Sequence, residues 1–233
     1  MRPALLLSSL LIASTAQADI LGLTAEIGMF SPDADINFSD HNKTSGSNDI
    51  SADTSTYYGI AFEHPLPLIP NVRLQGTSLE TSGTVTSSTT FNGSNLTGKA
   101  ALDLSHTDYT LYYEFLDGLL WLDLDAGFTL RNFDGSIELA TQKADFNAII
   151  PMGYVSAYVT VPGTSIALGG ELKTLAIGDS SITDTTLKVK YETPFLVGIE
   201  GGYRSMDIDL VDIDGKDINS KNSGMFIGAS IDF

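Results

Sequence analysis

The sequence predicts an all-β fold, a closed antiparallel transmembrane β-barrel whose strands follow one another up and down around the ring. Three observations predict it: side chains alternate with period two, the alternating segments are long, and compact turns alternate with longer polar loops. Successive side chains of a strand point to opposite faces, so each segment has one apolar face and one polar or small face. We expect about ten strands, with about eight or twelve as the alternatives.

The expected strands cover residues 20–31, 50–63, 72–82, 101–115, 120–133, 146–160, 165–177, 182–193, 196–208 and 222–233. A tilted strand crosses the hydrocarbon of a membrane with about 9–11 residues, and each of these segments is long enough. Lipid offers no hydrogen bonds to an open sheet edge, so such a sheet has to close into a barrel.

The connections between these strands alternate in length. Compact turns rich in Pro and Gly are expected at 64–71, 116–119, 161–164 and 194–195, and polar loops at 32–49, 83–100, 134–145, 178–181 and 209–221. Short turns at one end and longer polar loops at the other are typical of outer-membrane barrels. An even number of strands places both termini at the short-turn end, which we expect to face the periplasm.

The first 18 residues have the features of a secretory signal peptide. Arg2 supplies the positive charge, Ala4–Ala13 is mostly apolar, and Ala16 and Ala18 form an A-x-A cleavage site before Asp19. We therefore expect a signal peptide at 1–18 and one barrel domain at 19–233. No stretch of about 18 apolar residues follows the signal peptide, which excludes a helical span. The outer membrane of a Gram-negative bacterium is the predicted location.

The last expected strand supports this location. It presents a continuous apolar face that ends in an aromatic residue, formed by Met225, Ile227, Ala229, Ile231 and Phe233. This ending resembles the C-terminal signal that the barrel-assembly machinery reads. Aromatic residues also collect on the apolar faces near strand ends, as they do at a lipid–water boundary. A β-sandwich core also alternates, but its strands are normally shorter and more closely spaced.

Three segments carry a resemblance to a known family. They are the Pro-rich turn His64–Leu74, the strand Glu200–Arg204 and the terminal Phe233. Together they resemble a family of small proteobacterial outer-membrane β-barrels without an assigned activity. The resemblance covers the mature chain and implies its fold and location. It supplies no catalytic residue.

Charge and composition exclude several kinds of partner. The net charge is −17, and nucleic-acid binding would need clustered Lys and Arg. The chain has no cysteine, which excludes a disulfide scaffold and thiolate metal sites. We expect a monomer without a cofactor. Its expected partners are outer-membrane lipid and, during biogenesis, the barrel-assembly machinery and periplasmic chaperones.

The polar faces of the expected strands carry charges of both signs. A barrel of this size has an interior barely wider than its own side chains, so opposite charges there should pair. The alternative interpretation is a narrow charged pore or a small-ligand pocket. The candidate lumen charges are Glu26, Glu63, Arg73, Glu114, Asp123, Asp125, Arg131, Glu171, Lys173, Lys188, Lys190, Glu192, Glu200 and Arg204.

Catalytic and metal-binding motifs are weak. His106 shares a face with Asp108, but no G-x-S-x-G sequence surrounds a serine, and we expect no enzyme activity. Five aspartates crowd the segment from Asp207 to Asp217. Its spacing misses the full calcium-loop pattern, so the sequence leaves a solvated turn and a calcium site both open.

The predicted function is therefore that of an integral outer-membrane barrel with a structural or surface-interaction role and no catalysis. A narrow channel or small-molecule transporter is the first alternative. An outer-membrane lipid-modifying enzyme is the more distant one.

Overall fold

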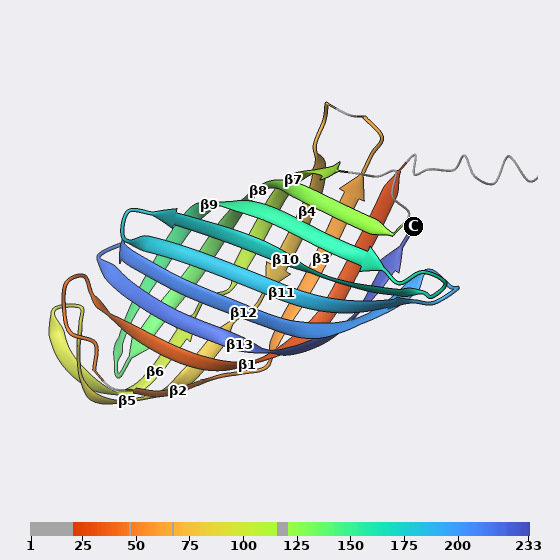
Figure 1. The fold of residues 1–233 in the computed structure, drawn as a ribbon. Coiled ribbons are helices and arrows are strands. Elements are labelled where there is room, and N and C mark those ends of the chain that lie inside the picture. Colours follow the sequence, from red (N-terminus) through yellow and green to blue (C-terminus); the bar gives the residue numbers. More distant parts are fainter. Residues whose placement is uncertain (1–20, 47, 67, 116–120) are drawn as a thin grey trace, which may run out of the picture.

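The structure, a computed structural model, describes residues 21–46, 48–66, 68–115 and 121–233. The expected signal peptide, with Ala16, Ala18 and Asp19, lies outside these residues. The described chain contains strands and turns only, and ten strands close into an antiparallel barrel in up-and-down order (Figure 1). The predicted fold class is confirmed.

Thirteen strands are defined in the described residues because three of the ten ring positions are interrupted. The strands are β1 (Gly22–Asp40), β2 (Asn48–Ala52), β3 (Ser55–Glu63), β4 (Asn71–Thr77), β5 (Glu80–Phe91), β6 (Ser94–Asp103), β7 (His106–Phe115), β8 (Leu122–Leu139), β9 (Gln142–Thr160), β10 (Ile166–Ile177), β11 (Ser180–Glu192), β12 (Val197–Ile213) and β13 (Lys216–Asp232). The ring runs β1-β3-β4-β7-β8-β9-β10-β11-β12-β13 and returns to β1.

The three remaining strands, β2, β5 and β6, lengthen the ring strands β3, β4 and β7 beyond short breaks. β2 pairs with β5, β5 with β6, and β6 with the far end of β8. Hydrogen bonds bridge the breaks: the amide of Leu104 donates to the carbonyl of Leu79, at 2.8 Å, and the Leu79 amide donates to Ser105 Oγ, at 3.0 Å. The barrel wall therefore continues well past the ring.

The predicted polar loops are mostly wrong, because strands occupy most of their length. β1 continues to Asp40, β5 and β6 form a hairpin that spans 83–100, and β8 and β9 extend into 134–145. The segment 209–221 is the end of a β12–β13 hairpin whose turn is Asp214-Gly215, with φ of 48° and 78°. Positive φ at both positions is what a tight hairpin turn requires. The expected turn at 116–119 lies outside the described residues.

The barrel has two halves that differ in polarity. The terminal half is the region nearest the two chain ends, and the distal half contains the long hairpins at the other end (Figure 1). In the terminal region of β12, apolar side chains such as Ile199 and Tyr203 point outward and Glu200 points inward. Past Arg204 the inward side chains become apolar and the outward ones polar, as at Ile208 and Asp207. The same alternate positions of β12 point inward on both sides of Arg204, and only the polarity of their side chains changes.

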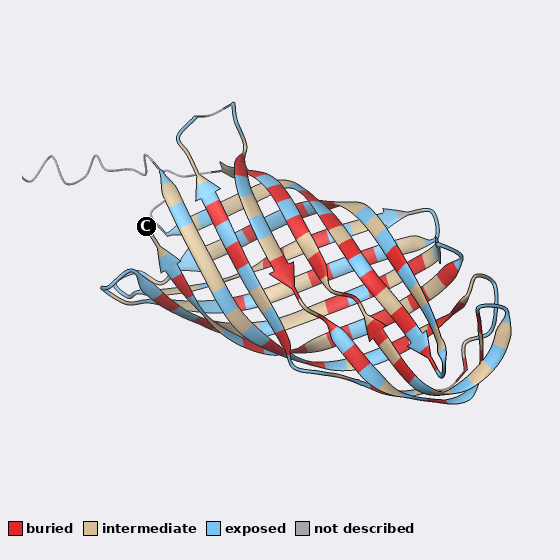
Figure 2. Cartoon of the chain, turned by 180° about the vertical axis from the view of Figure 1, so that it is seen from behind, coloured by how far each residue is buried: buried red, intermediate tan, exposed pale blue. Residues whose placement is uncertain are grey.

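The distal half of the lumen is filled by apolar side chains. Inward-facing residues of most strands pack into one buried apolar cluster. Figure 2 marks all buried positions, apolar and polar, in red. The cluster comprises Phe30, Ile36, Phe38, Ile50, Leu79, Val85, Phe91, Ala100, Leu102, Leu104, Phe133, Ile137, Leu139, Phe146, Met152, Ile182, Met206, Ile208, Leu210, Ile218 and Phe226. Apolar side chains inside and polar side chains outside are the arrangement that the hydrophobic effect favours in water.

The outer surface of the terminal half is an apolar belt. Its exposed aromatic side chains are Tyr58, Phe62, Tyr109, Tyr113, Phe115, Trp121, Phe128, Tyr191, Phe195, Tyr203 and Phe233. The proposed assembly-signal residues Met225, Ile227, Ile231 and Phe233 are exposed on this belt, and Ala229 lies in register with them on β13. No helix long and apolar enough to cross a membrane occurs among the described residues.

Candidate functional site

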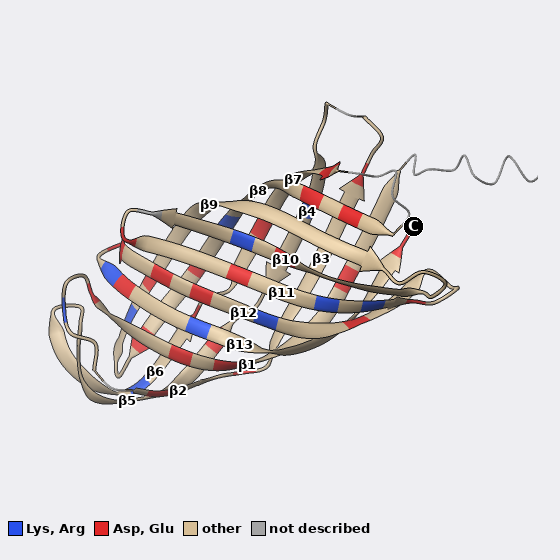
Figure 3. Cartoon of the chain, viewed as in Figure 1, with Lys and Arg blue, Asp and Glu red and all other residues tan. Residues whose placement is uncertain are grey.

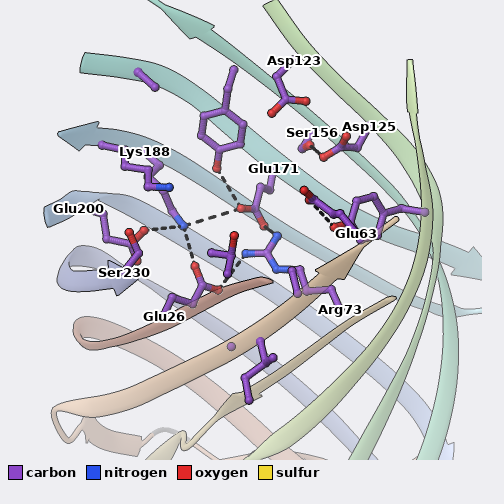
Figure 4. Close-up of a pocket in the computed structure, with 18 of the residues that line it drawn as sticks. Glu26, Glu63, Arg73, Asp123, Asp125, Ser156, Glu171, Lys188, Glu200 and Ser230 are labelled. Carbon is purple, nitrogen blue, oxygen red and sulfur yellow. Dashed lines mark hydrogen bonds and ion pairs between the residues drawn. The ribbon is translucent and has the colours of Figure 1, made fainter. Parts of the chain in front are cut away.

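The lumen of the terminal half contains a first layer of ion pairs (Figure 4). Arg73 on β4 donates to Glu26 on β1, at 2.8 Å, and to Glu171 on β10, at 3.0 Å. Lys188 on β11 lies 3.1 Å from the second oxygen of Glu26 and 3.0 Å from Glu200 on β12. The strands β1 and β4 are thus linked to the consecutive strands β10, β11 and β12 through inward-facing side chains.

A second layer lies deeper, next to the apolar core. Arg131 is fully buried and binds Asp108 through two nitrogens, at 2.7 and 2.8 Å, and Asp184 at 2.7 Å. Lys173 lies 2.7 Å from Asp108, and Arg204 binds both oxygens of Asp184, at 3.0 and 2.7 Å. Three cations therefore face two buried carboxylates. A buried charge is tolerated only when paired and hydrogen-bonded in this way.

Tyrosine hydroxyls occupy further acceptor positions on the lumen carboxylates. Tyr57 donates to Glu200, at 2.7 Å, and Tyr158 donates to Glu171, at 2.9 Å. An ionised carboxylate can accept several hydrogen bonds, and these hydroxyl donors fill acceptor positions that the ion pairs leave open. The two layers form one connected polar network, in which each side chain restricts the others.

Two cavities lie around these layers. The larger, about 200 Å³, extends from the first layer to the terminal mouth, and the smaller, about 40 Å³, lies between the two layers. Beyond the second layer the described lumen contains the apolar cluster of the distal half. The lumen is therefore accessible from the terminal mouth, narrows at the ion pairs and is filled at the distal end.

The structure places the candidate lumen charges on inward faces and brings most of them together. Nine of them, Glu26, Arg73, Arg131, Glu171, Lys173, Lys188, Lys190, Glu200 and Arg204, make buried or half-buried ion pairs, and Lys190 also contacts Glu192. Glu114 instead accepts a hydrogen bond from Asn71, and Glu63 and Asp125 accept from hydroxyls. Asp123 lines the larger cavity.

The sequence-based search missed two central residues of the second layer. The sequence pattern indicates Asp108 only as a partner of His106 and does not single out Asp184. Both share the inward register of charges that the alternation identified, Asp184 with Lys188 on β11. That register was the signal that could have found them. The lumen end of β13 adds Asp232, which lies 2.9 Å from Lys190.

The possible pairing of His106 with Asp108 does not form. Nδ1 of His106 donates to the carbonyl of Leu104, at 2.9 Å, while the Asp108 oxygens bind Arg131 and Lys173. The ring of His106 packs against Phe133, with 5.3 Å between centroids. These contacts give His106 the environment of a core residue.

The tip of the distal half holds a contact between His41 and Asp217. Nδ1 of His41 donates to Asp217, at 2.8 Å, and Asp217 also accepts from the amides of Asn42 and Asp212. The hydrogen bond to Asp217 raises the pKa of His41, and the negative charge of Asp212 adds to the effect. Partial burial would raise the pKa of Asp217, but the bonds from His41 and the two amides outweigh it and lower that pKa.

The same contacts bear on the calcium question left by the sequence. Asp217 is occupied by three donors, and Asp214 belongs to the hairpin turn. Among the residues that the structure describes, no group of three or more His, Cys, Asp or Glu side chains is arranged to hold a metal ion. Asp40 makes a second set of contacts at this tip. It accepts hydrogen bonds from the amides of Asn92 and Gly93 and from Lys216.

Comparison with known proteins places the fold. No protein-family model matches the chain, and no curated protein matches it in sequence. Among solved structures, the outer-membrane protease OmpT from Escherichia coli matches with a TM-score of 0.57 and 12% identity, over 91% of this chain and 97% of that one.

Two other outer-membrane structures match less well. OprG from Pseudomonas aeruginosa has a TM-score of 0.38 and 10% identity, over 91% of this chain and 95% of that one. The translocator domain of the autotransporter NalP from Neisseria meningitidis has a TM-score of 0.40 and 9% identity, over 97% and 92%. At these identities the likeness to OmpT concerns the fold alone. The chain therefore has the fold of Gram-negative outer-membrane β-barrels.

Proposed function

We propose that the protein is an integral outer-membrane barrel that does not conduct and whose distal half stands outside the membrane as a rigid acidic surface for contacts with other molecules. The observation that carries this proposal is the inversion of polarity between the halves. An apolar exterior fits lipid, and a polar exterior around an apolar core fits water. The terminal half is thus the membrane-embedded half, with both chain ends on the periplasmic side.

The distal surface supports a contact role because its exposed charged residues are mostly acidic. Figure 3 marks the positions of all charged residues along the strands. The exposed lysines of the distal surface are few: Lys43, Lys99, Lys143 and Lys221. Its exposed acids are Asp33, Asp35, Asp49, Asp53, Glu80, Asp134, Glu138, Asp145, Asp179, Asp207, Asp212 and Asp214. Such a surface repels polyanions and favours cationic partners.

The channel alternative is less well supported by the lumen. A solute moving through it would have to separate both layers of ion pairs and then cross a packed apolar cluster. Removing one ion pair would leave the second barrier in place. The Arg131→Ala variant loses part of the deeper ion-pair layer but keeps the apolar cluster. We therefore expect its lumen to remain closed to solutes, as in the wild type.

The enzyme alternative is less well supported, because the histidine–carboxylate pair that the sequence suggested does not form in the described residues. His106 is engaged as a core residue, and its neighbouring carboxylate belongs to the ion-pair network. We propose no catalytic role. Turnover of labelled phospholipid or lipopolysaccharide by the purified protein, lost in His41→Asn or His106→Asn, would contradict this.

The main proposal is tested by two measurements. Membrane fractionation and gel electrophoresis with and without heating should find a heat-modifiable outer-membrane protein. Planar-bilayer recordings of the same preparation should show no steady conductance, while a general porin in the same bilayer conducts. Recovery in the soluble periplasmic fraction would contradict the membrane assignment. Steady, reproducible conductance would contradict the closed lumen.

Biogenesis gives a further check. We propose that the barrel-assembly machinery reads the outward face of β13 together with Phe233, the exposed aromatic residue that follows the strand. Deletion of Phe233 should reduce the heat-modifiable form, and Phe233→Tyr, which keeps an aromatic ring, should restore it. Normal insertion without Phe233 would remove this element of the proposal.

A further inference from the structure

The larger lumen cavity is bounded on its inner side by charges and reaches the terminal mouth on its outer side. Arg73 and Lys188 of the first ion-pair layer form its inner boundary. Its outer lining includes Glu63, Thr160 and Glu192, each the last residue of its strand. Figure 4 shows the charged residues of several strands pointing into this space.

The lining carries an excess of negative charge. Its seven carboxylates, against three cations, give a formal charge of 3 − 7 = −4. The cations are Arg73, Lys188 and Lys190, and the carboxylates are Glu26, Glu63, Asp123, Asp125, Glu171, Glu192 and Glu200. Every one of the three cations is already paired: Arg73 and Lys188 within the first layer, and Lys190 with Glu192 and Asp232.

Two of the carboxylates have no cationic partner among the described residues. Glu63 accepts a hydrogen bond from the Tyr112 hydroxyl, at 2.7 Å, and Asp125 accepts one from Ser156, at 2.6 Å. The other oxygen of Asp125 is buried without a hydrogen-bond partner, and so is Oγ of Ser230, whose side chain is 2% exposed and lines the same cavity. Unmet buried polar groups of this kind call for a bound molecule or ordered water.

Aromatic side chains line the same wall. Tyr112, Tyr154 and Tyr158 all contribute to the cavity, and the rings of Tyr112 and Tyr154 pack edge to face at 6.0 Å. Tyrosine rings attract cations at their faces and give apolar contact to the carbon atoms of a ligand. Carboxylates beside aromatic rings suit a cation that has an apolar body.

We propose that this cavity binds a small organic cation, a protonated primary amine with a short carbon chain, whose ammonium group lies between Glu63 and Asp125. The volume of about 200 Å³ is below the ~300–1,000 Å³ of pockets for drug-sized ligands, so the ligand has to be small. An anion finds no available cation here. A bare metal ion finds no group of three ligating side chains in the described residues.

The test uses n-butylammonium chloride and isothermal titration with the folded full-length mature protein in detergent. We expect saturable binding of one ligand per barrel. Asp125→Asn and Glu63→Gln keep the hydroxyl contacts but remove one charge each. Each should weaken binding about tenfold, which is the loss expected for one hydrogen bond to a charged group. Asp207→Asn, which removes a charge from the exposed distal surface, should leave binding unchanged.

Several outcomes would overturn the inference. They are the absence of saturable binding, equal affinity in wild type, Asp125→Asn and Glu63→Gln, or tighter binding of propionate or Mg²⁺ than of butylammonium. The heat-modifiable gel band verifies that each variant is folded before titration. The inference is independent of the closed lumen, because a conducting barrel could bind the amine and a non-conducting one could fail to bind it.

Discussion

The terminal and distal halves are made from the same ten strand positions, yet they bury opposite kinds of side chain. On β12 the terminal half exposes Ile199 and buries Glu200, whereas the distal half exposes Asp207 and buries Ile208. On β8 the same change falls between Arg131 and Phe133, both fully buried. Both β8 and β12 run across this boundary as single strands, so backbone pairing does not determine which face is apolar.

The difference teaches that the surroundings of a barrel select its polarity. In lipid, apolar side chains gain nothing by facing inward, and polar ones must satisfy each other in the lumen. In water, the hydrophobic effect favours apolar side chains inside. The lumen therefore contains two obstructions of different chemistry: ion pairs in the terminal half and packed apolar side chains in the distal half.

The largest expected effect comes from breaking the ion-pair layer at the boundary. Arg131→Ala leaves Asp108 and Asp184 buried with fewer partners, and removal of one member of a buried ion pair costs about 3–5 kcal/mol. The free energy of unfolding in detergent, followed by the folded gel band, should fall by about this amount. Lys143→Ala removes a half-exposed cation and should change little. Equal stability of both variants would contradict the ion-pair network.

The second comparison uses one residue type on both sides of the boundary. Ile208→Ala opens a cavity in the distal core and should cost about 2–5 kcal/mol. Ile199→Ala, at 54% exposure on the apolar belt of the same strand, should cost less because lipid or detergent fills the space. Urea unfolding in micelles measures both. Equal losses would mean that the belt is packed like a core.

A smaller effect is expected at the β12–β13 turn. Gly215 has φ of 78°, where a side chain is strained, so Gly215→Ala should cost about 1–2 kcal/mol. Gly153→Ala is the matched control, because its added Cβ would meet only the Thr174 carbonyl, at 3.8 Å. The midpoint of thermal unfolding should fall for the first variant and not for the second. A fall for both would point to a general effect of removing glycine.

The smallest effect concerns pH at the distal tip. The raised pKa of His41 means that its bond to Asp217 stabilises the tip fully below the ordinary histidine pKa, and that this contribution is lost as pH rises through the raised value. Titration of the His41 ring by NMR should show a lower pKa in Asp217→Asn. Asp207→Asn, elsewhere on the surface, should leave it unchanged. An unchanged titration in Asp217→Asn would contradict the contact.

Sequence reasoning predicted the closed ten-stranded meander because alternation in the terminal half is regular. It missed the strand extensions because the apolar positions change phase at the boundary. On β12 they are odd-numbered up to Tyr203 and even-numbered from Met206 to Leu210. A one-residue change of phase resembles the end of a strand, and outward Asp and Ser then resemble a loop. A rule that expects the outward face to stay apolar along a whole strand therefore fails to predict the strands of the distal half.

The candidate site was predictable in composition but not in pairing. Alternation identified inward charges such as Arg131 and Lys188. Which carboxylate each one meets depends on ring closure, tilt and strand register, which bring β1, β4 and β10 together around Arg73. The cavity proposed to bind an amine is harder still to predict from sequence, because its chemistry depends on which carboxylates remain without a cation after the ion pairs form.

The central claim is that the boundary between the halves is the boundary between lipid and water. The chain has no cysteine, so a single cysteine introduced into β12 can carry the only spin label of the protein in lipid vesicles. The four variants are Ile199→Cys, Tyr203→Cys, Asp207→Cys and Ile208→Cys. Collision with oxygen should dominate for labels at 199 and 203, and collision with a water-soluble nickel chelate at 207, while 208 is protected from both. A label at 207 that collides mainly with oxygen, or labels at 199 and 203 that are accessible to nickel, would contradict the account.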